Sequence, residues 1–130
     1  MKASVQASHV VFALDCPDAL ALAQFYADLL GWVVRVDAAD PDWVEVVAPA
    51  GDKSGFSLAF QQIEHYRMPE WPDGEVAQQA HLDFHVDSLQ RAGAIAEAAG
   101  ATKHLRQPLS DATFAVYTDP AGHPFCLCEV

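Results

Sequence analysis

The segment that decides the fold is Trp43–Gly51, WVEVVAPAG, because it returns 71 residues later as Phe114–Gly122, FAVYTDPAG. Each copy reads as a short strand that ends in a turn marked by Pro-Ala-Gly. A spacing near 70 residues is too long for a solenoid repeat, which usually spans about 20–50 residues. The echo therefore predicts two copies of a half-domain within one body.

Three further pairs of segments repeat in the same order. They are His9–Asp15 with His81–Asp87, Leu30–Gly31 with Ala99–Gly100, and Phe56–Ala59 with Phe125–Cys128. Their offsets are 72, 69 and 69 residues. The chain is therefore predicted to be internally duplicated, and each half is built as strand, helix and three strands.

The length of 130 residues and the apolar content of 52% are those of one ordinary domain, which we take to be residues 1–130. We place a first module at about residues 6–62, a connector at about 63–78 and a second module at about 79–130. No apolar run reaches the roughly 18 residues of a membrane span, and the N-terminal residues lack the apolar stretch of a signal peptide. We therefore expect a cytoplasmic protein that does not interact with membranes.

Acidic residues outnumber basic ones by 18 to 7, which gives a net charge of −11. This balance argues against nucleic acid as a partner, because binding it requires Lys and Arg to neutralise phosphates. The charge either attracts a cationic ligand or serves solubility alone. The three cysteines do not make a disulfide framework, and we expect them to be reduced thiols.

Hydrophobic periodicity predicts the elements of each half. In the first half we predict strands at 9–15, 32–37, 43–47 and 56–62 and a helix at about 18–30. In the second half we predict strands at 80–86, near 103–107, 113–118 and 124–129 and a helix at about 88–99. The first helix presents Leu22, Phe25, Tyr26 and Leu29 on one face. These elements predict an α+β fold in which helices cover one face of an open sheet.

Alternation along the strands sorts side chains between the helix-facing side and the open side. In the second module the apolar residues at 82, 84 and 86 face the helix, so His81, Asp83 and His85 face the open side. The same alternation places on the open side His9, Ser57, Ala59, Gln61, Cys126 and Cys128. A curved sheet with polar groups on its open side is a natural small-molecule cleft.

Each of these residues also has an ordinary structural interpretation. His9 and His81 are either structural residues or, because duplication gives them equivalent positions, a pair that pseudo-symmetry brings together. Asp83 and His85 are either a surface pair or candidates for a general base. Cys126 is either a small buried residue or a reactive thiol.

The irregular segment His65–Gly74 has no counterpart in the second half. It is either a plain linker or, through Tyr66 and Trp71, a wall of the ligand site. Trp43 and Tyr117 are further aromatic residues that belong either to the core or to a ligand groove.

Several motifs accompany the duplicated plan, namely Phe25-Tyr26 followed by Leu30-Gly31, and Asp119-Pro-Ala-Gly122 before the last strand. Together they resemble the vicinal oxygen chelate superfamily, which includes glyoxalase I, extradiol dioxygenases and bleomycin-resistance proteins. More narrowly, four segments look like the glyoxalase-like domains common in actinobacteria: Leu58–Gln61, Trp71–Pro72, Gln79–Phe84 and Asp119–Cys126. The resemblance covers nearly the whole chain. It implies two pseudo-symmetric βαβββ modules that form an open cup-shaped sheet with helices on the outer face, usually as a homodimer.

In metal-dependent members of that superfamily, the first and fourth strands of each module hold a divalent cation, typically through His and Glu. The resemblance maps the first-strand ligands to His9 and His81 and the fourth-strand ligands to Ser57 and Cys126, with Ala59 or Gln61 as other options for Ser57. The mapped pairs carry no carboxylate, which Mg²⁺ or Mn²⁺ requires. We therefore predict no cofactor and a small-molecule-binding protein of the bleomycin-resistance type, with a cationic or aromatic ligand.

Two other hypotheses stay open. Zn²⁺ accepts His and thiolate ligands, so His9, His81 and Cys126 would suit a metal-dependent lyase, isomerase or dioxygenase with His85 or Asp83 as general base. Alternatively, the chain is a structural or regulatory module whose cup has lost its function.

Overall fold

The computed structural model describes residues 3–108, 110 and 112–130. The chain divides into two compact units after Glu64, so all of the connector except residues 63–64 belongs to the second unit. Each unit contains one helix and one four-stranded mixed sheet in the order βαβββ. The predicted α+β fold of two βαβββ modules is therefore confirmed. No helix among the described residues combines the length and the apolar character needed to cross a membrane.

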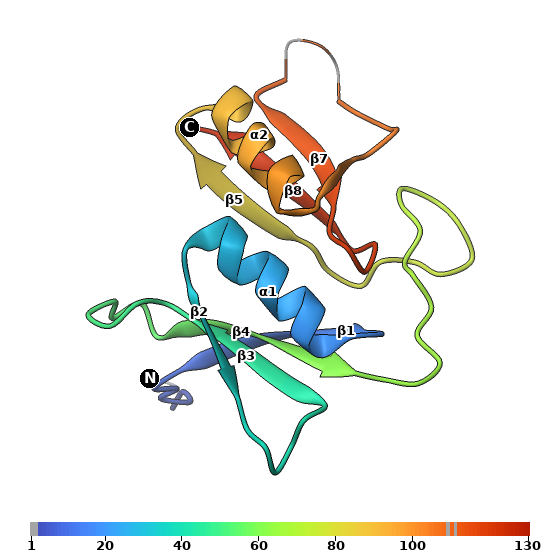
Figure 1. Ribbon diagram of the computed structural model, residues 1–130. Coiled ribbons are helices and arrows are strands. Elements are labelled where there is room, and N and C mark those ends of the chain that lie inside the picture. Colours follow the sequence, from blue (N-terminus) through green and yellow to red (C-terminus); the bar gives the residue numbers. More distant parts are fainter. Residues whose placement is uncertain (1–2, 109, 111) are drawn as a thin grey trace. The chain divides into compact units, whose positions relative to one another are not determined.

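The first module contains β1 (Val10–Cys16), α1 (Ala19–Leu30), β2 (Val33–Val36), β3 (Trp43–Val47) and β4 (Phe56–Gln62). The strand order in the sheet is β1-β4-β3-β2. β1 and β4 pair in parallel, whereas the other neighbours are antiparallel (Figure 1). A parallel pair needs a long connection between its strands, which α1, β2 and β3 supply.

The ends of α1 follow from two residues of the sequence. Asp18 is the N-cap, and its Oδ1 accepts a hydrogen bond of 3.0 Å from the backbone N–H of Ala21. Gly31 ends the helix with φ of 69°, a left-handed conformation that favours glycine. These caps explain why the predicted and observed helix agree to within one residue.

The apolar face of α1 packs on its own sheet. Leu22, Phe25 and Tyr26 are buried, as the periodicity predicted. The ring of Tyr26 stacks on Phe60 of β4, with centroids 5.2 Å apart. Ser57, Ala59 and Gln61, which alternate with Leu58 and Phe60 along β4, lie on the opposite face of the sheet.

The second module contains β5 (Leu82–Val86), α2 (Leu89–Ala99), β6 (Thr102–Lys103), β7 (Phe114–Thr118) and β8 (Pro124–Glu129). Its strand order, β5-β8-β7-β6, repeats that of the first sheet, and β5 and β8 are parallel. Its core contains Tyr117, which stacks on Phe125 at 5.9 Å and is 5% exposed. Tyr117 is therefore a core residue, which settles the choice that the sequence left open.

The strand predicted near 103–107 is shorter than expected and ends at Lys103. The reason is the side chain of Gln107, which takes the place of a neighbouring strand. Its Oε1 accepts a hydrogen bond of 2.9 Å from the N–H of Val116, and its Nε2 donates one of 2.6 Å to the carbonyl of Val116. One further backbone bond follows Lys103, from the N–H of His104 to the carbonyl of Val116 at 3.0 Å, and the amide of Gln107 then bonds to both backbone groups of Val116.

The register of the parallel pairs confirms the internal duplication. Val10 lies opposite Phe56 in the first module, and Leu82 lies opposite Phe125 in the second. The offsets of 72 and 69 residues seen in the sequence therefore describe one structural equivalence.

The echo between β3 and β7 is displaced from its structural equivalence by two residues. Val47 lies opposite Ser57, whereas Val116 lies opposite Cys126. The equivalence in these strands thus has an offset of 69, and the sequence echo has 71. A shift of two keeps every side chain on its face of the sheet, so the predicted faces are unaffected.

Candidate ligand-binding site

The open face of the first sheet follows from the strand register, since directly opposite residues share a face. On β4 this face carries Ser57, Ala59 and Gln61. Opposite them stand Val11, Ala13 and Asp15 on β1 and Val47, Glu45 and Trp43 on β3. The candidate residues Ser57 and Gln61 are therefore on one face, four residues apart on the same strand.

His9 and Ser57 are in direct contact at one end of this face. His9 Nε2 lies 2.8 Å from Ser57 Oγ, and Ser57 is only 1% exposed. These are the positions to which the resemblance mapped one first-strand and one fourth-strand metal ligand. A neutral hydroxyl thus stands at the position where the resemblance leads us to expect a carboxylate in metal-dependent members.

Glu45 is a carboxylate on the same face that the sequence reasoning missed. It lies opposite Ala59, and its Oε1 accepts hydrogen bonds from Arg35 Nη2 at 2.8 Å and Nε at 3.2 Å. The alternation in Trp43-Val-Glu45 was the signal that could have found it. Because Arg35 compensates its charge, Glu45 is an ion-pair partner rather than an isolated carboxylate.

The second sheet brings three of the predicted residues together. Asp83 on β5 lies opposite Cys126 on β8, and His81 Nε2 lies 3.2 Å from Asp83 Oδ1. His81, Asp83 and Cys126 each offer one potential ligand atom, and these three atoms all lie within 4.8 Å of one another. We call this set the His-Asp-Cys cluster. His85 stands outside it, opposite Cys128.

The local electrostatics keep the thiol of the cluster protonated. Burial, the charge of Asp83, a hydrogen bond to Asp83 and the neighbouring Cys128 raise the pKa of Cys126 from 9.0 to about 12. Burial and Asp83 also raise the pKa of Cys128. At neutral pH Cys126 is therefore a hydrogen-bond donor and not a thiolate nucleophile.

The turn before β8 anchors the connector of the second unit. Asp119 is buried, and its Oδ1 accepts hydrogen bonds from the N–H groups of Ala121 at 2.9 Å and His123 at 3.0 Å. The hydroxyl of Tyr66 donates to the carbonyl of Ala121 at 2.8 Å. Gly122, with φ of 89°, leaves room for Met68, which a Cβ at that position would strike.

The two aromatic residues of the connector have different neighbours. Tyr66 contacts the turn, where its hydroxyl also lies 3.2 Å from His123 Nε2. Trp71 packs edge-to-face against His104, with ring centroids 5.1 Å apart. Because Tyr66 contacts Ala121 and His123 and Trp71 contacts His104, the connector packs on the second unit.

The chemistry of the potential ligand atoms determines which metal ions they match. His9 and His81 with Ser57 and Cys126 offer no carboxylate, so the mapped positions do not fit a hard cation such as Mg²⁺. The His-Asp-Cys cluster offers nitrogen, oxygen and sulfur, a set that fits Zn²⁺ with one open position. The approach of His9 to His81 remains a prediction.

Two βαβββ modules, each with parallel first and fourth strands, define the vicinal oxygen chelate class of protein. The model of the family called "Glyoxalase-like domain" matches residues 11–128. The chain therefore belongs to this glyoxalase-like family. No curated protein matches the sequence.

Solved structures with low sequence identity share the fold. A glyoxalase/bleomycin resistance protein/dioxygenase family enzyme from Burkholderia phytofirmans PsJN is 18% identical, with a TM-score of 0.66 over 97% of this chain and 99% of that one. TnmS3, an antibiotic binding protein from Streptomyces sp. CB03234, is 18% identical, with a TM-score of 0.60 over 99% and 98%. The fosfomycin resistance protein FosX from Listeria monocytogenes is 12% identical, with a TM-score of 0.64 over 100% and 95%. At these identities the likeness establishes the fold and not the activity.

Proposed function

We propose that the protein binds a small organic molecule, cationic or aromatic, on the open faces of its sheets, and that binding needs no divalent metal. The contact residues in this proposal are His9, Ser57, Gln61, Tyr66, Trp71, His81, Asp83, His85 and Cys126.

The contact between His9 and Ser57 carries the proposal. An imidazole bonded to a hydroxyl at 2.8 Å offers polar ligands both donors and acceptors, but it offers a hard cation no anionic ligand. The net charge of −11 supports a cationic ligand, because the field of the whole protein concentrates positive charge. The antibiotic binding protein TnmS3, which shares this fold, supports a binding role.

A binding assay with and without chelator tests the proposal. Protein purified without chelator is titrated with a panel of cationic and aromatic compounds and followed by Trp fluorescence and calorimetry. We expect at least one compound to bind equally well in EDTA, and we expect His9→Ala and His81→Ala to weaken it. His65→Ala, an exposed histidine outside the proposed face, is the matched control. Binding that disappears in EDTA, or no binding by any compound, would overturn the proposal.

The His-Asp-Cys cluster favours a second candidate function, a zinc-dependent lyase, isomerase or dioxygenase. There His81, Asp83 and Cys126 would hold the ion and His85 would serve as general base. Bound zinc would polarise a carbonyl or activate water. Metal analysis tests this candidate, which requires stoichiometric zinc that is lost in His81→Ala and Cys126→Ser and retained in Cys128→Ser. Metal-free protein that takes up no added zinc would exclude it.

The proposal includes a homodimer, as the resemblance implies. Light scattering measures this directly, and we expect twice the chain mass of 14.1 kDa. A mass equal to one chain at micromolar concentration would contradict it.

A further inference from the structure

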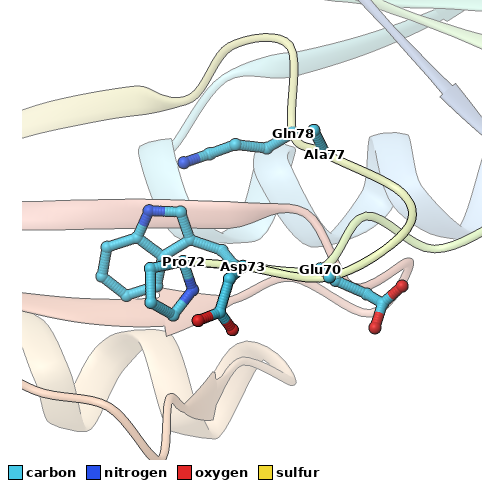
Figure 2. Close-up of a pocket in the computed structure, with 7 residues that line it drawn as sticks. Glu70, Pro72, Asp73, Ala77 and Gln78 are labelled. Atoms are coloured by element: carbon cyan, nitrogen blue, oxygen red, sulfur yellow. The ribbon is translucent and has the colours of Figure 1, made fainter.

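The connector forms a hollow in the second unit that is partly open to solvent. Its volume is about 380 Å³, within the usual range of roughly 300–1,000 Å³ for small-molecule sites. It is lined by Glu70, Trp71, Pro72, Asp73, Gly74, Ala77 and Gln78 (Figure 2). We call this the connector hollow.

The loop around the connector hollow is fixed by Glu70. The backbone N–H of Glu70 donates to the carbonyl of Val76 at 2.6 Å, and Glu70 Oε1 accepts from the N–H groups of Glu75 at 3.1 Å and Val76 at 3.2 Å. Gly74 lies so close to the Glu70 side chain that a Cβ there would collide with it. Figure 2 shows the Glu70 carboxylate directed away from Pro72 and Gln78. Glu70 therefore shapes the loop, and the hollow exists before any ligand arrives.

Gln78 carries the observation that points to a ligand. Its side-chain oxygen is buried and accepts no hydrogen bond from any residue that the structure describes. A buried polar atom without a partner is costly and calls for an explanation. Because Gln78 lines the hollow, a hydrogen-bond donor bound there would give this oxygen a partner after a small movement of the side chain. Such a group must donate a hydrogen bond.

The other lining residues define the charge and shape of that group. Trp71 supplies an aromatic surface and is positioned by His104 at 5.1 Å. Asp73 supplies a carboxylate, and the seven lining residues include no Lys or Arg. An aromatic face, a carboxylate and an amide acceptor together recognise a flat cation that carries N–H groups.

We propose that the connector hollow binds a flat organic cation with N–H donors, of the aryl-amidinium type, through Trp71, Asp73 and Gln78. This site goes beyond the proposed function, because it is formed by the connector and not by the open faces of the sheets. Trp71 is also a contact residue of the proposed function, but Asp73 and Gln78 are not, so variants of Asp73 and Gln78 test this site separately.

Benzamidinium is the probe, and neutral benzamide of nearly the same shape is its control. Calorimetry gives the affinity, and the indole N–H resonance of Trp71 reports the location, assigned with Trp71→Phe. We expect benzamidinium to bind about tenfold or more tightly than benzamide, because the charge-assisted contact is lost in the amide. Gln78→Leu and Asp73→Asn should each weaken benzamidinium by about tenfold.

Matched controls change neighbours that do not line the hollow. Gln79→Leu repeats the Gln78 substitution one residue later, and Glu75→Gln neutralises another exposed carboxylate of the connector. Both should bind benzamidinium as the wild type does.

Three outcomes would overturn the proposal. The first is benzamidinium bound equally by wild type, Gln78→Leu and Asp73→Asn. The second is a Trp71 resonance that does not move. The third is no binding at all. If His81→Ala abolishes benzamidinium binding while the connector variants bind it normally, the proposal for the connector hollow is wrong and the proposed function stands. If no compound of any kind binds, both fail.

Discussion

Asp83 lies directly opposite Cys126 in the parallel pair of β5 and β8, and its carboxylate lies within 4.8 Å of the Cys126 thiol. Burial, followed by the charge of Asp83, raises the pKa of the thiol to about 12. The carboxylate thereby stabilises the protonated thiol, which is the opposite of what a catalytic cysteine requires.

Asp83→Asn is therefore expected to lower the pKa of Cys126, because the repulsion between carboxylate and thiolate disappears. The rate of alkylation by iodoacetamide, followed against pH and assigned to Cys126 by peptide mass spectrometry, measures this. Asp87→Asn, just beyond the same strand, should leave the profile unchanged. Identical profiles for Asp83→Asn and wild type would contradict the assigned cause.

Stability should fall in alkaline solution. The pKa of Cys126 is raised from 9.0 to about 12, so the unfolded thiol ionises first as the pH rises. The contribution of Cys126 is fully present below pH 9.0 and is lost towards pH 12. In Cys126→Ser the unfolding free energy should decline less steeply over this window in urea titrations. Tyr117, whose pKa is also raised by burial, accounts for part of the remaining slope. Equal slopes in wild type and Cys126→Ser would refute the linkage.

The contact between His9 and Ser57 should behave as one coupled unit. Ser57→Ala and His9→Ala are each expected to lower the unfolding free energy by about 1 kcal/mol, the usual net value of a hydrogen bond. The double variant should lose less than the sum of the two, because each single variant already breaks the bond. Chemical denaturation of all four proteins completes the cycle. Simple additivity would mean that the bond is absent in solution.

Gly93 in α2 is expected to resist replacement by alanine. Alanine is favoured over glycine in a helix by about 1 kcal/mol. A Cβ at Gly93, however, would lie 2.5 Å from the hydroxyl of Tyr117, and such overpacking costs about 1–3 kcal/mol. Gly93→Ala should therefore destabilise the wild type and stabilise the Tyr117→Phe background, in which the hydroxyl is gone. Stabilisation in both backgrounds, measured by urea denaturation, would show that the hydroxyl moves aside freely.

Gln78→Leu should stabilise the protein while it weakens benzamidinium binding. Removing a buried oxygen without a partner is expected to raise the unfolding free energy by about 1 kcal/mol. Gln79→Leu, at an exposed neighbour, should change it by less than about 0.5 kcal/mol. A less stable Gln78→Leu variant would mean that the amide has a partner in solution.

Most of the fold could be predicted because local signals mark its boundaries. Asp18 and Gly31 cap α1, and the alternation of β1, β4, β5 and β8 assigns their faces. The length of β6 could not be predicted, because the side-chain amide of Gln107 pairs with Val116 where a longer strand would have continued the backbone ladder. No local sequence pattern indicates that the Gln107 side chain hydrogen-bonds to Val116, nine positions away.

The candidate site was partly accessible to the same reasoning. Alternation placed Asp83 on the same face as Cys126, and the strand register then made them neighbours. Glu45 was not predicted as a site residue, because its role depends on its ion pair with Arg35 on the neighbouring strand. Gln78 escaped because the burial of an unpaired oxygen is a property of packing and has no signature along the chain.

The displacement of the β3 and β7 echo by two residues has a consequence for comparing the two halves. In these strands, the face that a side chain occupies depends on whether the offset between the halves is even or odd, and not on matching residue types. Any superposition of the modules that shifts a strand by an odd step would exchange inward and outward side chains throughout it. A shift by an even number of residues leaves every side chain on its face of the sheet. The two halves can therefore differ in sequence and still keep the same positions facing inward or outward.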